Sequence, residues 1–250
     1  MNNHSDKIIV SFCKIEIKRG KTYTFLGLRM RCIYCKSQTY LLKNGYRKCK
    51  ICKRKFSPKK VEREYLIIEC FYRDLTILEC SKKIKIHYTA VKRIYEQIRK
   101  KIALLLEEDY QNRKDILEFD EYIYLEKSKR RDKKNIFDGY NFLTFDYGGK
   151  IYNLMMPDLS RYKSSFVADG LEEIYYKEFE KFLKIHRISK LSSRYNLITK
   201  FWKYFESFIP KFKGINRENF FYYLKEAEFK FNYTQKEQKE ILEKLFFPRK

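Results

Sequence analysis

The apolar residues of this chain follow two different periods, which divide it into parts. Between residues 62 and 110 they recur every three or four positions, the spacing that places side chains on one face of a helix. From residue 115 they alternate with polar residues, as in a half-buried strand, and from Tyr195 the helical period returns in three stretches broken at 210–214 and near Tyr233. Antiparallel strands, then alternating strands and helices, then a helical end predict an α+β chain with a mixed β-sheet and helices on its faces.

The first helical region predicts a helix-turn-helix. Thr76 can cap a short helix, and the stretch "KIKIHY" can turn the chain into a longer helix that begins near Tyr88, with His87 as a capping or packing residue at the turn. In a helix-turn-helix the start of the second helix enters the major groove of DNA. The alternative is a basic helical hairpin that only connects two domains. The residues aimed at DNA would be Tyr88, Thr89, Lys92 and Arg93.

The strand region carries two candidate metal-binding carboxylates. "ILEFDEYIYLEK" is typical of a strand with Asp120 and Glu121 in its middle, and "YNFLTFDYGGKIYNLMMPD" of a hairpin that turns at Gly148 and Gly149. "SSFVADG" is typical of a fourth strand, which ends on Asp169. Asp120 and Asp169 on adjacent strands could hold Mg2+ for attack on a phosphodiester. The alternative is that they are strand residues with no shared role, although a charge inside an apolar strand is costly unless exposed or used.

The charge of the chain indicates a polyanionic partner. The formal net charge is +24, and residues 1–60 contain 17 Lys or Arg against two acids. Nucleic acid is the commonest partner of such a surface, although a Lys-rich composition can also come from an AT-rich genome. No apolar run is long enough to cross a membrane, and the first residues lack the pattern of a signal peptide. We therefore expect a soluble, cytoplasmic protein without membrane partners.

Four cysteines have the spacing of a zinc ribbon. Cys32, Cys35, Cys49 and Cys52 form C-x2-C-x13-C-x2-C, and two such pairs that face each other give the tetrahedral thiolate set that Zn2+ prefers. The sequence between the pairs predicts a strand, a turn at Asn44 and Gly45, and a second strand. Four sulfur ligands leave no open position, so the zinc would be structural. The alternative is that these are ordinary small apolar residues, the interpretation that suits the remaining cysteines, Cys13, Cys70 and Cys80.

The order of these parts resembles bacterial insertion-sequence transposases of the DDE class with an N-terminal zinc ribbon. The similarity covers roughly residues 29–246 and is most specific in "EFDEYIY", "GGKIYNLMMPD", "ADG" and "RYNLITKFWKYFESFIPKFKGINRENFFYYLKEAEFKFN". It implies a ribonuclease H-like core that uses Mg2+ or Mn2+ to cut and rejoin double-stranded DNA at the element's terminal inverted repeats and at a target. It also implies a homodimer or higher assembly on DNA, associated with the bacterial nucleoid.

The resemblance assigns roles to individual residues. Asp120 takes the place of the first catalytic acid, Asp169 that of the second, and Asn196 matches the Asn that opens the family's last core helix. The basic segment "KSKRRDKK", residues 127–134, matches the loop after the first strand and adds three DNA-binding candidates, Lys129, Arg130 and Arg131.

Two departures from the family pattern bear on activity. Thr199 stands where the family has its third acid, and Glu206, seven residues later, stands where it has Lys. Glu206 would share a helix face with position 199 but lie ~10 Å further along the axis, which makes it a weak third acid. Only residues 159–165 separate the third and fourth strands, too few for an ordinary parallel crossover. Either the crossover helix is trimmed, or Asp169 is not the equivalent of the second acid and the helix after it is the crossover. The leading interpretation is an insertion-sequence transposase. The alternatives are a decayed or repurposed transposase that only binds DNA, which Thr199 favours, and an unrelated transcription factor, which the C-terminal signature disfavours.

The sequence thus predicts five parts. They are an N-terminal extension of unknown role (1–28), a zinc ribbon (29–58), a helix-turn-helix (62–110), a transposase core (115–232) and a C-terminal helix (233–250).

Overall fold

The computed structural model describes residues 31–112, 118–129, 139–157 and 196–247. Three candidate site residues, Asp169, Arg130 and Arg131, lie outside these ranges. The N-terminal extension, the predicted fourth strand and the helix and strand predicted after it lie outside them as well.

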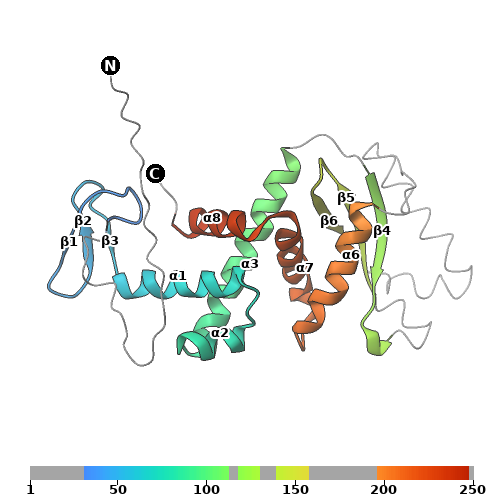
Figure 1. The fold of residues 1–250 in the computed structure, drawn as a ribbon, viewed down its shortest axis with the longest axis horizontal. Helices are drawn as coiled ribbons and strands as arrows, with labels where there is room; N and C mark the ends of the chain where they lie inside the picture. Colours follow the sequence, from blue (N-terminus) through green and yellow to red (C-terminus); the bar gives the residue numbers. More distant parts are fainter. Residues whose placement is uncertain (1–30, 113–117, 130–138, 158–195, 248–250) are drawn as a thin grey trace, which may run out of the picture.

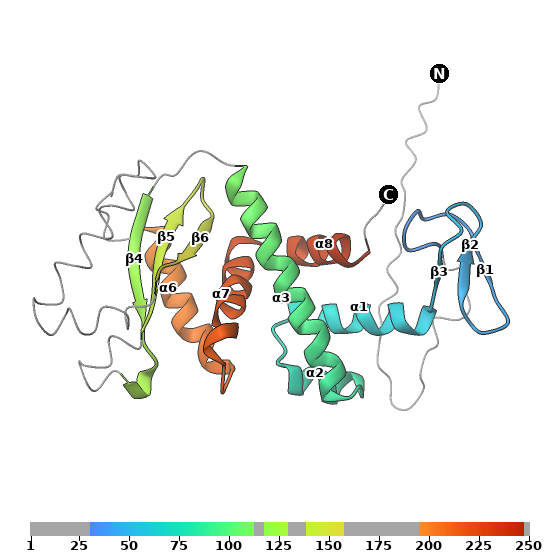
Figure 2. The same ribbon diagram turned by 180° about the vertical axis from the view of Figure 1, so that it is seen from behind.

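The described residues form an α+β chain with two small antiparallel sheets and six α-helices (Figures 1 and 2). In chain order the elements are β1 (Thr39–Leu41), β2 (Arg47–Cys49), β3 (Lys55–Phe56), α1 (Pro58–Tyr72), α2 (Ile77–Ile84), α3 (Tyr88–Gln111), β4 (Glu118–Tyr124), the 3-10 helix η1 (Lys127–Lys129), β5 (Tyr140–Asp146), β6 (Ile151–Met155), α6 (Leu197–Phe208), the 3-10 helix η4 (Ile209–Lys211), α7 (Arg217–Asn232) and α8 (Gln235–Phe246). The α+β prediction is confirmed, and none of the helices in the described ranges is long and apolar enough to cross a lipid bilayer.

The first sheet is the predicted ribbon. β1 and β2 pair antiparallel around the turn at Asn44 and Gly45, where Gly45 has φ +78°, a conformation that glycine adopts without steric cost. β3 adds to the other edge of β2 through Arg47 opposite Phe56. The buried Phe56 belongs to the same apolar cluster as helix α1, so the ribbon and the helices share a core.

The helices of the N-terminal half begin at residues that cap them. Ser57 accepts a hydrogen bond from the Lys60 backbone N–H and is followed by Pro58 at the first helical position, which is why α1 begins inside the range predicted for the ribbon. Thr76 and Glu79 form a capping box at the start of α2, and His87 caps α3 through its ring nitrogen. The predicted caps at Thr76 and His87 are confirmed.

Helix α8, predicted as a separate C-terminal part, packs on α1. Thr234 and Glu237 form its capping box. Its Leu242, together with Phe247, is buried in the apolar cluster of α1, α2 and α3, and the Phe247 ring stacks on Tyr65 at 4.2 Å. Helices α1, α2 and α3 therefore share one apolar core with α8.

The second sheet has strand order β4-β5-β6, and α6 and α7 cover one of its faces (Figure 1). The covered face carries Tyr124, Phe142 and Ile151, which pack with aromatic residues of both helices. The opposite face carries a second cluster that includes Phe119 and Phe145, with Tyr110 of α3 packed against it. The predicted first strand and the hairpin at Gly148 and Gly149 are confirmed.

Helix α7 pairs with the free edge of β6 through its side chains. Asn232 accepts a hydrogen bond from the Ile151 backbone N–H and donates one to the Ile151 carbonyl, at 2.8 and 2.7 Å. Two residues on, Glu228 accepts from the Asn153 N–H, and Lys225 donates to the Asn153 carbonyl. An open strand edge is normally a site for unwanted pairing, so these side chains both satisfy the edge and fix α7 against the sheet.

Candidate functional site

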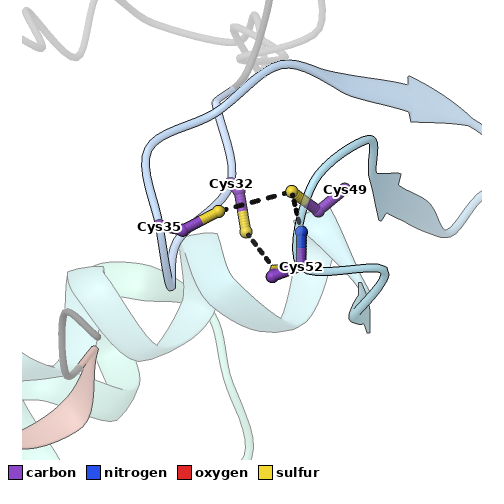
Figure 3. A group of neighbouring side chains, drawn as sticks. All are labelled: Cys32, Cys35, Cys49 and Cys52. Carbon is purple, nitrogen blue, oxygen red and sulfur yellow. Dashed lines mark hydrogen bonds between the residues drawn. The ribbon is translucent and has the colours of Figure 1, made fainter.

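The four cysteine sulfurs converge between the two turns of the ribbon (Figure 3). Cys32 Sγ lies 3.6 Å from Cys52 Sγ, Cys35 Sγ lies 3.4 Å from Cys49 Sγ, and the four sulfurs all lie within 4.8 Å of one another. A tetrahedron with Zn–S bonds of ~2.3 Å has edges of ~3.8 Å. The cluster could therefore bind a metal ion such as zinc, and the donor set fits a closed structural site.

The backbone of each cysteine pair is shaped around its sulfurs. Lys36 and Lys53, which directly follow the second cysteine of each pair, both have φ +58°. In the second pair the backbone N–H groups of Ile51 and Cys52 both donate to Cys49 Sγ at 3.3 Å. These two N–H groups fix the position of the Cys49 sulfur among the four.

Two of these thiols have shifted pKa values in opposite directions. Hydrogen bonding with the side chain and the backbone of Ser37 lowers the pKa of Cys35 to about 6. A backbone hydrogen bond from Arg54 lowers the pKa of Cys52, but burial and the neighbouring thiols raise it to about 12. The Cys52 thiol therefore keeps its proton at neutral pH, and a bound cation would displace that proton.

The other described cysteines serve the apolar core. Cys70 of α1 and Cys80 of α2 are both buried in the cluster of the N-terminal helices. This placement agrees with their interpretation as small apolar residues, and neither belongs to the group of sulfurs that could hold a metal.

The turn between α2 and α3 positions the residues predicted to contact DNA. Only residues 85–87 separate the two helices, and Lys85 has the left-handed conformation (φ +55°) that ends α2. Ser81 Oγ donates to the Ile86 carbonyl at 2.7 Å and holds the turn. The first turn of α3 then exposes all four predicted residues, Tyr88, Thr89, Lys92 and Arg93.

These four residues are not equivalent. Thr89 makes a 2.8 Å hydrogen bond between its hydroxyl and His87 Nδ1, so its side chain helps to cap the helix. Tyr88 is 44% exposed. Lys92 lies 3.9 Å from the exposed Glu96, one helical turn further along. A surface ion pair of this kind contributes little stability and leaves the lysine available for a phosphate.

Sequence reasoning missed a second set of basic residues beside them. Lys82 and Lys83 in the last turn of α2 and Lys85 in the following turn are exposed, next in the chain to the start of α3. The lysines clustered in the segment "SKKIK" are the signal in the sequence that could have identified this second set. The pattern of apolar residues there indicates only that the chain turns. By contrast, Lys129 ends η1 after β4, at the sheet end of the molecule and apart from the start of α3 (Figures 1 and 2).

Asp120 is the third residue of β4 and begins a row of polar side chains across the sheet. It is directly opposite Thr144 of β5, which is opposite Asn153 of β6. Thr144 Oγ1 donates to Asn153 Oδ1 at 2.8 Å and accepts from Trp202 Nε1 of α6 at 3.1 Å. Trp202 therefore fixes α6 to β5 at the residue directly opposite Asp120.

The row ends in a buried ion pair. Asn153 Nδ2 donates to Glu228 Oε2 at 3.0 Å, and Lys225 Nζ lies 3.0 Å from the same oxygen. Burial lowers the pKa of Lys225 and raises that of Glu228, while each charge opposes the shift of the other. Together with their backbone contacts to β6, these two residues have a structural role.

Helix α6 presents Thr199 and Glu206 in different settings. Asn196 caps the helix, and its Oδ1 accepts from both the Thr199 backbone N–H and the Thr199 hydroxyl, each at 2.8 Å. Thr199 lies one helical turn before Trp202, the residue that is hydrogen-bonded to Thr144 in the polar row. Glu206 accepts a 2.6 Å hydrogen bond from the hydroxyl of Tyr122, whose ring stacks on Trp202. Where the resemblance predicts a third acid, α6 thus carries a threonine that is bound to the capping residue Asn196.

No family model, curated protein or solved structure matches this chain. The resemblance to DDE transposases therefore depends on the motifs quoted above, and the functional assignment depends on the sites described here.

Proposed function

We propose that the protein binds double-stranded DNA through the α2–turn–α3 unit. The observation that carries this proposal is the exposed first turn of α3, where Tyr88, Lys92 and Arg93 lie next in the chain to the exposed lysines of α2 and the turn. In a helix-turn-helix the N-terminal residues of the second helix contact base edges, while flanking basic residues contact phosphates.

The zinc ribbon supports the same proposal as a second basic module. Its four cysteines would hold one structural Zn2+, which would stabilise a sheet too small to fold by burial alone. The ribbon shares its apolar core with α1, so its orientation relative to the helix-turn-helix would be fixed by packing.

We further propose that the second sheet and its helices belong to a ribonuclease H-like transposase core. Three antiparallel strands with Asp120 in the first, and a helix capped by Asn196 with Trp202 packed on the sheet, support this proposal. In this proposal Asp169, outside the described residues, would supply the second carboxylate for Mg2+ or Mn2+. A homodimer would match the twofold relation of inverted repeats.

Within this scaffold, DNA binding without cleavage is the function that the site favours. The position of the third acid holds Thr199, whose hydroxyl is bound to Asn196, and Glu206 is bound to Tyr122. Two-metal cleavage depends on carboxylates to hold both cations. An active transposase is the second candidate, favoured by the position of Asp120 within β4.

A cleavage assay separates the two candidates. A labelled duplex selected for binding from a random library would be incubated with the full chain and Mn2+, in parallel with Asp120→Asn and Thr199→Glu. If only the chain with Thr199→Glu cuts, the wild type is a binding protein on a transposase core. Cleavage by the wild type that Asp120→Asn abolishes would establish the enzyme and overturn this choice.

A further inference from the structure

The ribbon sheet presents an outward face that combines aromatic and basic residues. Tyr40 of β1 is directly opposite Lys48 of β2, and Lys48 is opposite Lys55 of β3, so the three lie in one row on one face. The same register places Gln38 opposite Lys50 and Leu42 opposite Tyr46, with backbone hydrogen bonds at both positions. Because side chains alternate along a strand, Tyr46 and Lys50 lie on the face of Tyr40 and Lys48.

The opposite face is the one that packs. Cys49 and Phe56, on the alternate positions of β2 and β3, are buried against the metal cluster and α1. The Tyr40 face is therefore the outward one in the described part of the molecule.

In the described ranges few aromatic rings are exposed, and they gather at basic surfaces. Among the residues that the structure describes, the only exposed aromatic residues are Tyr40, Tyr46 and Tyr88. Tyr88 belongs to the DNA-binding turn proposed above. The other two, 41% and 46% exposed, are diagonal neighbours on the outward face of the ribbon.

The charge around these two rings fits a phosphate backbone. No Asp or Glu occurs between Arg31 and Phe56. Lys48 lies directly opposite Tyr40, and Lys50 lies diagonally to it. Aromatic rings flanked by lysines are the arrangement by which sheet surfaces bind unpaired bases, with the rings stacking on bases and the ammonium groups contacting phosphates.

We infer that the outward face of the ribbon, defined by Tyr40, Tyr46, Lys48, Lys50 and Lys55, binds single-stranded DNA by base stacking. The inference rests on the proposed DNA-binding function and adds a second site with a different substrate. In a duplex the flat faces of the bases are covered by their neighbours, so rings that stack select unpaired nucleotides. The helix-turn-helix would hold the duplex, and the ribbon would hold an unpaired strand next to it.

The test is the affinity of the full chain for a fluorescent single strand and for the same sequence as a duplex, measured by anisotropy at fixed salt. Each stacked base contributes ~1–3 kcal/mol, so Tyr40→Ala with Tyr46→Ala is expected to weaken single-strand binding by roughly 30-fold or more. Duplex affinity should stay within about twofold. Tyr40→Phe with Tyr46→Phe should retain single-strand binding, because phenyl rings also stack.

Leu41→Ala is the matched control. Leu41 is 59% exposed on the neighbouring position of β1, which points to the other face, so its truncation should leave single-strand affinity unchanged. Zinc content measured for every variant confirms that the ribbon is folded. Unchanged single-strand binding in the folded double alanine variant, or an equal loss in Leu41→Ala, would overturn the inference. Loss of duplex binding in Lys92→Ala with Arg93→Ala reports separately on the proposed function.

Discussion

Arg99 of α3 donates from Nε to Glu226 Oε2 of α7 at 2.6 Å, and both side chains are almost completely buried. Lys230 lies 3.0 Å from the other oxygen of Glu226 and 2.6 Å from Asp74, which follows α1. These charges connect the helix-turn-helix to the helix that satisfies the edge of the second sheet. The helix-turn-helix and the second sheet, which the sequence analysis assigns to separate parts, are therefore joined through α7.

Removing the Glu226 charge should destabilise the whole fold. Glu226→Gln leaves the buried Arg99 without its carboxylate, although Lys230 keeps its ion pair with Asp74, and breaking a buried pair in this way costs roughly 3–5 kcal/mol. The free energy of unfolding from urea titration, followed by circular dichroism, would measure this loss. Glu218→Gln, the same change at an exposed position of α7, should alter stability by less than about 0.5 kcal/mol. Equal effects of the two substitutions would contradict this role of the pair.

The same carboxylate should make stability depend on acid pH. Burial alone would raise the pKa of Glu226, but the Arg99 and Lys230 cations hold it below its ordinary value of 4.5. A carboxylate with a lowered pKa in the folded state contributes stability above the unfolded-state pKa, and this contribution is lost as the pH falls through the folded-state pKa. Urea titrations from pH 7 to 3 should therefore show a steeper loss in the wild type than in Glu226→Gln. Parallel pH profiles would refute the assignment.

The Asn196 cap should contribute to the stability of α6. Asn196→Ala removes the acceptor for the Thr199 N–H and should cost about 1 kcal/mol of stability, whereas Asn196→Asp keeps a capping oxygen and should cost little. Thermal unfolding of both variants would measure the difference. If Asn196→Ala is as stable as the wild type, the cap does not hold the start of α6.

Metal binding should depend on the four clustered cysteines only. Cys35→Ser is expected to lose the bound zinc, while Cys70→Ser, a buried cysteine outside the cluster, should keep one zinc per chain even if it is less stable. Zinc should also be released as the pH falls, because protons compete for the sulfurs. Zinc content after gel filtration, across a pH series, measures both effects. A wild-type chain that carries no metal would disprove the zinc proposal.

Local patterns are sufficient to predict most elements of the fold. The caps at Thr76 and His87, the turn at Gly45 and the hairpin after β5 depend on neighbouring residues, and each lies where the sequence predicts it. The cysteine cluster is also predictable, because each pair is local and the predicted strand pair between them brings the two pairs together. The catalytic assignment to Asp169 stays a prediction.

Long-range pairings could not be predicted from one sequence. Arg99 and Glu226 are 127 positions apart, and a helical pattern gives the face of each residue but not its partner. The side-chain pairing of α7 with β6 likewise has no periodic signal, since Lys225, Glu228 and Asn232 occur on a helix rich in charge. The packing of α8 on α1 depends on the same missing information.

DNA binding by the first turn of α3 is the central claim, and duplex affinity at several salt concentrations tests it most directly. Lys92→Ala with Arg93→Ala should weaken binding roughly 10- to 100-fold and reduce the slope of log affinity against log salt by about 2, because two phosphates would no longer be neutralised. Lys236→Ala with Lys244→Ala removes the same charge from exposed positions of α8, which lies on the other side of α1 from α2 (Figure 1), and should change neither quantity by much. An unchanged affinity in the α3 variant, or an equal loss in the α8 variant, would contradict the claim.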